Sequence, residues 1–145
     1  MIIERIRKLP DDFHFLLEES LEENFGALKR LKNSHIDGKN TFSLPGEALF
    51  AARIGGELVG ICGLNIDPYQ ESSDIGRVRH LYVAKAHRLN GVGKQLISEL
   101  EAFAQASFSG LQLYTDDPNS GAFYVAIGYQ RGGIGKASHV KKLKT

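Results

Sequence analysis

Residues 79–103 read RHLYVAKAHRLNGVGKQLISELEAF and carry more structural information than any other part of this chain. The segment opens with β-branched and aromatic side chains, which predict a strand over His80–Val83. A short basic loop with two glycines follows. Apolar residues then recur at helical spacing and predict a helix with one buried face. These residues are Val92, Leu96, Ile97, Leu100, Phe103 and Ala104.

A glycine turn at a helix N-terminus is suited to binding an anion. The first-turn N–H groups have no partner within the helix, and the peptide dipoles place partial positive charge there. Gly91 and Gly93 have no Cβ, so a phosphate can approach the backbone closely. Arg88 and Lys94 add two cationic side chains. The turn therefore predicts a phosphate-binding site.

Two common phosphate-binding motifs do not fit this turn. The dinucleotide fingerprint requires a third glycine three residues after Gly93, where Leu96 stands. The P-loop requires Ser or Thr after its Gly–Lys pair, where Gln95 stands. The remaining pattern is R-x-x-G-x-G over residues 88–93. Alone it is a weak signal, because ordinary strand-to-helix turns contain similar glycines.

A second segment adds specificity. HLYVAKAHRLNGVGKQLI resembles the acetyl-CoA-binding motif of the GNAT N-acetyltransferases, and TDDPNSGAFYVAIGYQ resembles that family's helix A-x-x-x-Y-x-x-x-G-F. In the second motif Ser120 stands at the alanine, Tyr124 at the tyrosine, Gly128 at the glycine and Tyr129 at the phenylalanine. The two motifs occur in the right order over residues 77–130. The rest of the chain is similar to the family only in its order of elements.

The resemblance implies an α+β fold with a mixed, mostly antiparallel sheet of about six to seven strands, flanked by about four helices. The two central strands, His80–Val83 and Leu111–Thr115, are expected to splay apart. Backbone groups exposed by this separation would then pair with the pantetheine arm of the cofactor. The helical region near the N-terminus would form a wall of the acceptor pocket.

Local patterns predict the remaining elements. They are a strand over Ile2–Arg7; a helix capped by Asp11 with its apolar face at Phe13, Leu16, Leu17 and Leu21; a shorter helix over Ala27–Lys32; a loop over 33–45; strands over Ala48–Arg53 and Leu58–Leu64 joined through Gly55–Gly56; a polar connection over 67–74; a helix capped by Asp117 and closed by Gly128; and a last strand near His139–Leu143.

Composition indicates one globular domain over residues 1–145. Hydrophobic residues make up 42% and charged residues 24% of the chain. A net charge of +1 gives no basic field for nucleic acid, and no apolar run is long enough to span a membrane. The single cysteine, Cys62, lies in an apolar run and is expected to be a buried small hydrophobe. Its lack of a disulfide partner favours a cytoplasmic location.

The resemblance implies direct transfer of the acetyl group of acetyl-CoA to a primary amine in a ternary complex. The acceptor would be a small-molecule or peptide amine, and no metal ion is expected, because no histidine or cysteine spacing suits one. The protein would be a monomer or homodimer. The residues expected to contact the cofactor are Leu81, Tyr82, Val83, Arg88, Leu89, Asn90, Gly91, Val92, Gly93, Lys94, Asp117, Ser120 and Tyr124.

Tyr124 is the expected general acid. It matches the family position whose phenol protonates the departing thiolate, a role suited to an O–H donor. Backbone N–H groups near Tyr82–Val83 would stabilise the tetrahedral oxyanion. A tyrosine on a helix can also serve packing alone.

The general base is less well defined. Many family members carry a glutamate where this chain has Arg77, so that mechanism is excluded. His80 is a possible base because its ordinary pKa of about 6.5 suits proton transfer. Strand alternation, however, predicts that His80 lies on the opposite face from Arg77 and Leu81. Glu71 and Asp74 are further candidates, and an amine that binds already neutral would need no base.

Two other functions fit parts of the sequence. The same fold could bind acetyl-CoA as a sensor or subunit without catalysis. A different α+β protein could use the glycine turn for another phosphate ligand. The intact R-x-x-G-x-G pattern and the presence of Tyr124 favour the enzyme over both.

Overall fold

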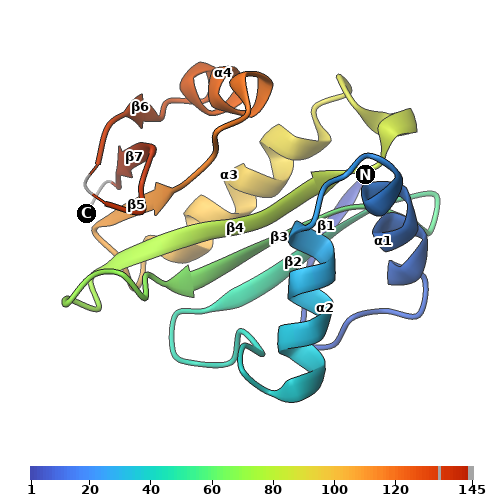
Figure 1. Ribbon diagram of the computed structural model, residues 1–145, viewed down its shortest axis with the longest axis horizontal. Coiled ribbons are helices and arrows are strands. Elements are labelled where there is room, and N and C mark those ends of the chain that lie inside the picture. Colours follow the sequence, from blue (N-terminus) through green and yellow to red (C-terminus); the bar gives the residue numbers. More distant parts are fainter. Residues whose placement is uncertain (134, 144–145) are drawn as a thin grey trace.

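The computed structural model describes residues 1–133 and 135–143, in which seven strands form one sheet (Figure 1). The strand order is β1-β2-β3-β4-β5-β7-β6; β4 and β5 are parallel, and the other neighbouring pairs are antiparallel. The predicted mixed, mostly antiparallel sheet is therefore confirmed. The strands are β1 (Ile2–Ile6), β2 (Ala48–Ile54), β3 (Glu57–Ile66), β4 (Ile75–Val83), β5 (Gly110–Leu113), β6 (Gln130–Arg131) and β7 (His139–Lys142).

Helices cover both faces of the sheet (Figure 1). Helices α1 (Phe13–Glu22) and α2 (Ala27–Asp37) share one apolar cluster with the sheet. Helices α3 (Val92–Ala104) and α4 (Pro118–Ala126) contribute to a second cluster on the opposite face. A short 3₁₀ turn, η1 (Lys85–His87), leads from β4 to α3. The sheet is thus the middle layer between two sets of helices.

The packing of α3 fixes where its N-terminus lies. Leu96 and Leu100 are fully buried against the sheet, and burying each contributes about 1.5–3 kcal/mol relative to exposure. Gly60 of β3 allows this close approach, because a Cβ there would lie 2.9 Å from the Cδ1 of Leu96. The start of α3 is therefore held beside the end of β4.

Cys62 is fully buried in the cluster beneath α3, as expected for a small hydrophobe. Burial raises the pKa of its thiol far above the ordinary value. The thiol is therefore unsuited to act as a nucleophile.

The first two helices differ in detail from the sequence prediction. Helix α2 continues to Asp37 and ends at Gly38, whose φ of 81° is left-handed, so the predicted loop begins later than residue 33. Helix α1 has Asp12 rather than Asp11 at its N-cap position. Leu21 is 43% exposed and does not belong to the apolar face. Helical spacing therefore predicted the buried face correctly for Phe13, Leu16 and Leu17 but not for Leu21.

Three strands also differ from their predicted extents. Strand β4 begins at Ile75, five residues before the predicted start, and β5 ends at Leu113. The short strand β6 was not predicted. The Asp117 cap is confirmed, because its carboxylate accepts a hydrogen bond from the Ser120 N–H at 3.0 Å.

Candidate active site

Strand β4 has neighbours on both sides only near its beginning. Residues 75–77 pair with β5, whereas pairing with β3 continues to Val83. Within the described residues, positions 78–83 have no strand partner on the β5 side. This confirms the predicted splay of the central strands. Unpaired N–H and C=O groups along such an edge can bind an extended ligand.

A β-bulge interrupts β4 at His80. Cys62 of β3 lies opposite both His80 and Leu81, and His80 has a left-handed φ of 61°. The His80 ring contacts Phe42 with centroids 6.0 Å apart, on the face covered by α1 and α2. Arg77 lies on the same face, since the residues on either side of it face α3. The expectation of opposite faces is therefore wrong for Arg77, because the bulge breaks the alternation, whereas Leu81 packs on the α3 face as expected.

The loop from Arg88 to Gly91 is exposed and directly precedes α3. The Gly91 carbonyl accepts the N–H of Gln95 at 3.0 Å, so the N–H groups of residues 92–94 have no acceptor within the helix. Leu89 is fully exposed and has a φ of 67°, so packing does not offset its backbone strain. The loop presents backbone donors at the positive end of a helix dipole.

The Arg88 side chain is bound to the end of α1. Its Nη1 donates to Glu23 Oε2 at 2.9 Å, and its Nη2 donates to Glu23 Oε1 at 2.5 Å. Its Nε donates to the Val83 carbonyl at 3.0 Å. The guanidinium is thus engaged within the protein, which leaves the backbone N–H groups and the exposed Lys94 facing solvent.

Two glutamates that the sequence analysis did not identify meet the Tyr82 hydroxyl. Glu19 Oε1 and Glu23 Oε1 each lie 2.7 Å from it, and Glu19 Oε1 also accepts the Lys85 N–H at 2.8 Å. Hydrogen bonds from Arg88 and Tyr82 lower the pKa of Glu23 to about 2. The four-residue spacing of these carboxylates was their one sequence signal, and it is common on solvated helix faces.

Tyr124 is buried in α4 and packs among three rings. The centroid distances are 5.1 Å to Phe123, 5.3 Å to Tyr129 and 6.3 Å to His139. Burial raises the pKa of Tyr124 above its ordinary value, and the nearby Cys62 thiol adds to this rise. Cys62 lies opposite the β4 bulge, so Tyr124 reaches the part of the sheet where β4 opens. Its hydroxyl forms no hydrogen bond to the described residues.

The candidate bases occupy different places. Burial, assisted by the charge of Arg79, lowers the pKa of His80 to about 4, so the imidazole is neutral but a weak proton acceptor. Asp74 directly precedes β4, and Tyr82 lies eight positions further along. At a rise of about 3.3 Å per residue, the two ends are roughly 25 Å apart. Asp74 and the nearby Glu71 are therefore too far from Tyr82–Val83 to act as the base.

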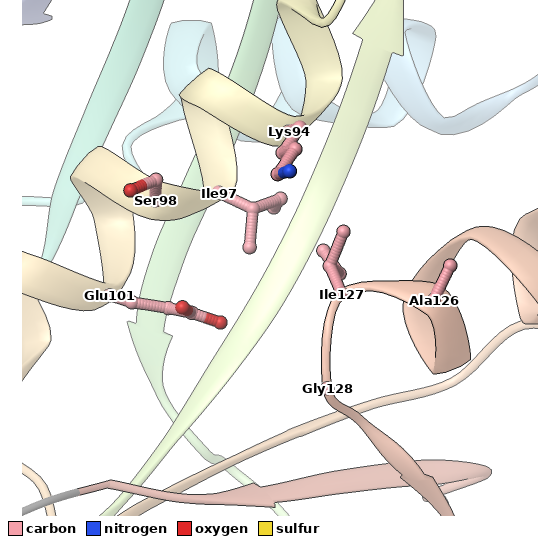
Figure 2. Close-up of a pocket in the computed structure, with 7 residues that line it drawn as sticks. All are labelled: Lys94, Ile97, Ser98, Glu101, Ala126, Ile127 and Gly128. Carbon is pink, nitrogen blue, oxygen red and sulfur yellow. The ribbon is translucent and has the colours of Figure 1, made fainter.

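A groove of about 420 Å³ separates α3 from the C-terminal end of α4 (Figure 2). Figure 2 shows Lys94 and Glu101 of α3 on one side and Ile127 on the other. Glu101 is paired with Lys141 of β7 at 3.0 Å, which closes one end with a salt bridge. Of the residues predicted to contact the cofactor, Lys94 lines this groove.

Among residues 1–133 and 135–143, no helix is both long and apolar enough to cross a bilayer. The same residues contain no group of three His, Cys, Asp or Glu side chains arranged to hold a metal ion.

Comparison with known proteins places this geometry in a family. Residues 5–129 match the sequence profile of the acetyltransferase (GNAT) family. The N-alpha-acetyltransferase RimI of Mycobacterium tuberculosis (strain ATCC 25618 / H37Rv) is 32% identical over 87 residues, which are 57% of this chain and 52% of that protein. The match thus spans about half the length of this relative.

Solved structures share the fold. A protein from Exiguobacterium sp. 255-15 with a proposed acetyltransferase assignment is 26% identical, with a TM-score of 0.86 over 97% of this chain and 92% of its own. An aminoglycoside 6'-N-acetyltransferase complexed with coenzyme A is 20% identical, with a TM-score of 0.74 over 100% of this chain and 98% of its own. At that identity the second comparison concerns the fold alone.

Proposed function

This chain belongs to the GNAT acetyltransferase family, and from this we propose that it transfers the acetyl group of acetyl-CoA directly to a primary amine in a ternary complex. The observation that carries the proposal is the opened edge of β4 ending beside the N-terminus of α3. A ligand with an extended arm could form hydrogen bonds with that edge while its phosphates bind the N-terminus of α3. Few ligands combine these two features, and an acyl-CoA is one of them.

The cofactor contacts follow from this placement. The pyrophosphate would bind the N–H groups of residues 92–94, with Lys94 adding charge. The pantetheine arm would pair with residues 81–83. A glycine at position 93 lets the start of α3 lie close to α4, because a Cβ there would lie 3.3 Å from the Phe123 ring. Arg88 holds the loop against Glu23 and acts as a positioning residue rather than a phosphate ligand.

The proposed reaction forms a C–N bond and breaks the C–S bond of the thioester. The amine nitrogen attacks the acetyl carbon, and the backbone N–H near Tyr82–Val83 stabilises the oxyanion. Burial raises the pKa of Tyr124, so its hydroxyl is protonated before the reaction. On collapse, the thiolate takes that proton, and solvent then returns a proton to the tyrosine oxygen. The attacking nitrogen loses its proton to water, since the low pKa of His80 makes that imidazole a weak base.

The acceptor is expected to be a small molecule or a peptide N-terminus. The named activity of the Mycobacterium tuberculosis relative favours the peptide, but that match covers about half of the relative. A sensor that binds acetyl-CoA without turnover is the alternative, and the Tyr124 hydroxyl, which forms no hydrogen bond to the described residues, favours the enzyme.

Two measurements test the proposal. A thermal shift with acetyl-CoA, with CoA, and with ATP as a control, asks whether the site selects the acyl-CoA. We expect stabilisation by the first two and little by ATP. Release of free CoA thiol is then followed across an amine panel. Stabilisation without thiol release for any amine would favour the sensor, and no stabilisation would contradict the proposed site.

A further inference from the structure

Arg79 of β4 is a half-buried cation without a carboxylate partner in the described residues. It lies two residues from Arg77, on the face of the strand covered by α1 and α2. Arg77 already takes the nearby acid: its Nη1 donates to Asp67 Oδ2 at 3.4 Å, and its Nη2 donates to the Lys136 carbonyl at 2.6 Å. The other Asp67 oxygen accepts the Tyr69 N–H at 2.9 Å. Asp67 therefore attracts Arg79 without forming a salt bridge to it.

A third arginine approaches from α2. The Arg30 guanidinium lies over the start of that helix, where a Cβ on Gly26 would be 2.9 Å from its Nη1. Arg30 is exposed, and its charge lowers the pKa of both Arg79 and His80. Burial has the largest effect on both groups, and the charge of Arg77 on Arg79 and of Arg79 on His80 also exceeds that of Arg30. Arg30 forms no salt bridge within residues 1–133 and 135–143. Neither Arg79 nor Arg30 thus forms a salt bridge in the part of the chain that the structure describes.

The other acidic groups that face this side of the sheet are occupied elsewhere. Glu47 is buried under the loop that precedes β2, where it accepts N–H groups from Leu44, Asn65 and Ile66. Glu19 and Glu23 both lie within hydrogen-bond distance of the Tyr82 hydroxyl, and Glu19 also accepts the Lys85 N–H. A half-buried charge without a partner is destabilising, so a ligand that supplies the opposite charge gains binding energy there.

We propose that the acceptor amine also carries an anionic group, a carboxylate or a phosphate, which binds Arg79 and Arg30. This inference rests on the proposed acetyl transfer. Arg79 precedes Tyr82 by three positions, so at about 3.3 Å per residue it lies roughly 10 Å from the proposed acetyl position. That span suits an amine and an anion within one amino acid or dipeptide. Polyamines and aminoglycosides bring further positive charge and are disfavoured.

Matched acceptors test the charge requirement. The pairs are alanylalanine with alanylalanine amide, and phosphoethanolamine with ethanolamine; spermidine serves as a polycation. Each is compared by kcat/KM from thiol release at one ionic strength. We expect the anionic member of at least one pair to be favoured by tenfold or more, and the pair that responds identifies carboxylate or phosphate. A preference for the neutral members or for spermidine would overturn the proposal.

Variants test the residues. Arg79→Gln and Arg30→Gln should each reduce that preference about tenfold through KM for the acceptor, with KM for acetyl-CoA unchanged. Lys29→Gln removes the same charge from an adjacent exposed position of α2 and should leave the preference intact. A preference unchanged in both arginine variants would refute the assignment.

A binding measurement separates this inference from the proposed function. Calorimetry in the presence of CoA compares each anionic amine with its neutral partner and needs no turnover. Anionic amines that bind through Arg79 without thiol release would refute the transferase and retain the anion site. Equal or undetectable binding of both members of every pair would overturn the anion site, whatever the turnover.

Discussion

Tyr124→Phe tests the proposed proton donor while leaving the packing of the ring intact. The hydroxyl forms no hydrogen bond to the described residues, so its removal leaves no partner unsatisfied. The free energy of unfolding should therefore change by less than about 1 kcal/mol. If the phenol protonates the thiolate, kcat should fall by about 10²–10⁴-fold, or roughly 3–5 kcal/mol in the barrier.

The assay is thiol release with one fixed acceptor at several pH values, together with calorimetric binding of acetyl-CoA. Affinity for acetyl-CoA should stay within about threefold. Because burial raises the pKa of Tyr124, its titration should cause no alkaline loss of wild-type activity below about pH 10.

Tyr129→Phe is the matched control. Its hydroxyl is buried and has no hydrogen-bond partner among the described residues, and its ring packs 5.3 Å from that of Tyr124. The control should keep the parental kcat. A Tyr124→Phe protein that is folded, binds acetyl-CoA and turns over at the parental rate across the pH range would refute the reasoning. Water or the ammonium formed on attack would then protonate the thiolate.

Three further predictions concern the loop and the buried charges. Gly91→Val should weaken acetyl-CoA binding more than about tenfold by calorimetry, because a β-branched residue does not readily adopt the φ of 80°. The control Gly38→Val, with a similar φ at the end of α2, should leave acetyl-CoA binding unchanged. The pKa of Glu23 is lowered to about 2, so its stabilising effect should be present above about pH 4.5 and be lost as the pH falls toward 2. The measurement is the difference in unfolding free energy between the wild type and Glu23→Gln. A difference that is constant through this pH range would contradict the pairing. The pKa of His80 is lowered to about 4, so between about pH 4 and 6.5 the unfolded chain binds a proton at this residue that the folded chain does not bind. This residue should therefore make stability rise from about pH 4 to 6.5. An NMR titration midpoint near 6.5 would show that His80 is not buried as described.

Periodicity and turn chemistry predicted most of the fold. Helix α3 has five buried apolar residues at helical spacing, and Asp117 with Pro118 marks the start of α4. The extension of α2 was missed because Asn33 and Ser34 favour loops on their own, while burial of Leu31 and the turn at Gly38 support the helix. Tertiary packing outweighed local preference there.

The site was less predictable, since its details depend on contacts between distant residues. No glycine at position 80 indicates the bulge in the sequence, because the bulge follows from the pairing of β4 with β3. The pairing of Arg88 with Glu23, 65 positions earlier, has no signal in the sequence pattern. The sequence does not indicate that Asp67 forms its salt bridge with Arg77 rather than with Arg79. Such partners cannot be inferred from spacing.

The full burial of Cys62 has a practical consequence for measuring this protein. A thiol reagent that reports released CoA should not react with the native chain, so the enzyme can be used at high concentration without background. Reaction of Cys62 then requires the cluster beneath α3 to open. Its alkylation rate in the absence of substrate therefore measures opening of that cluster, with the native sequence serving as its own label.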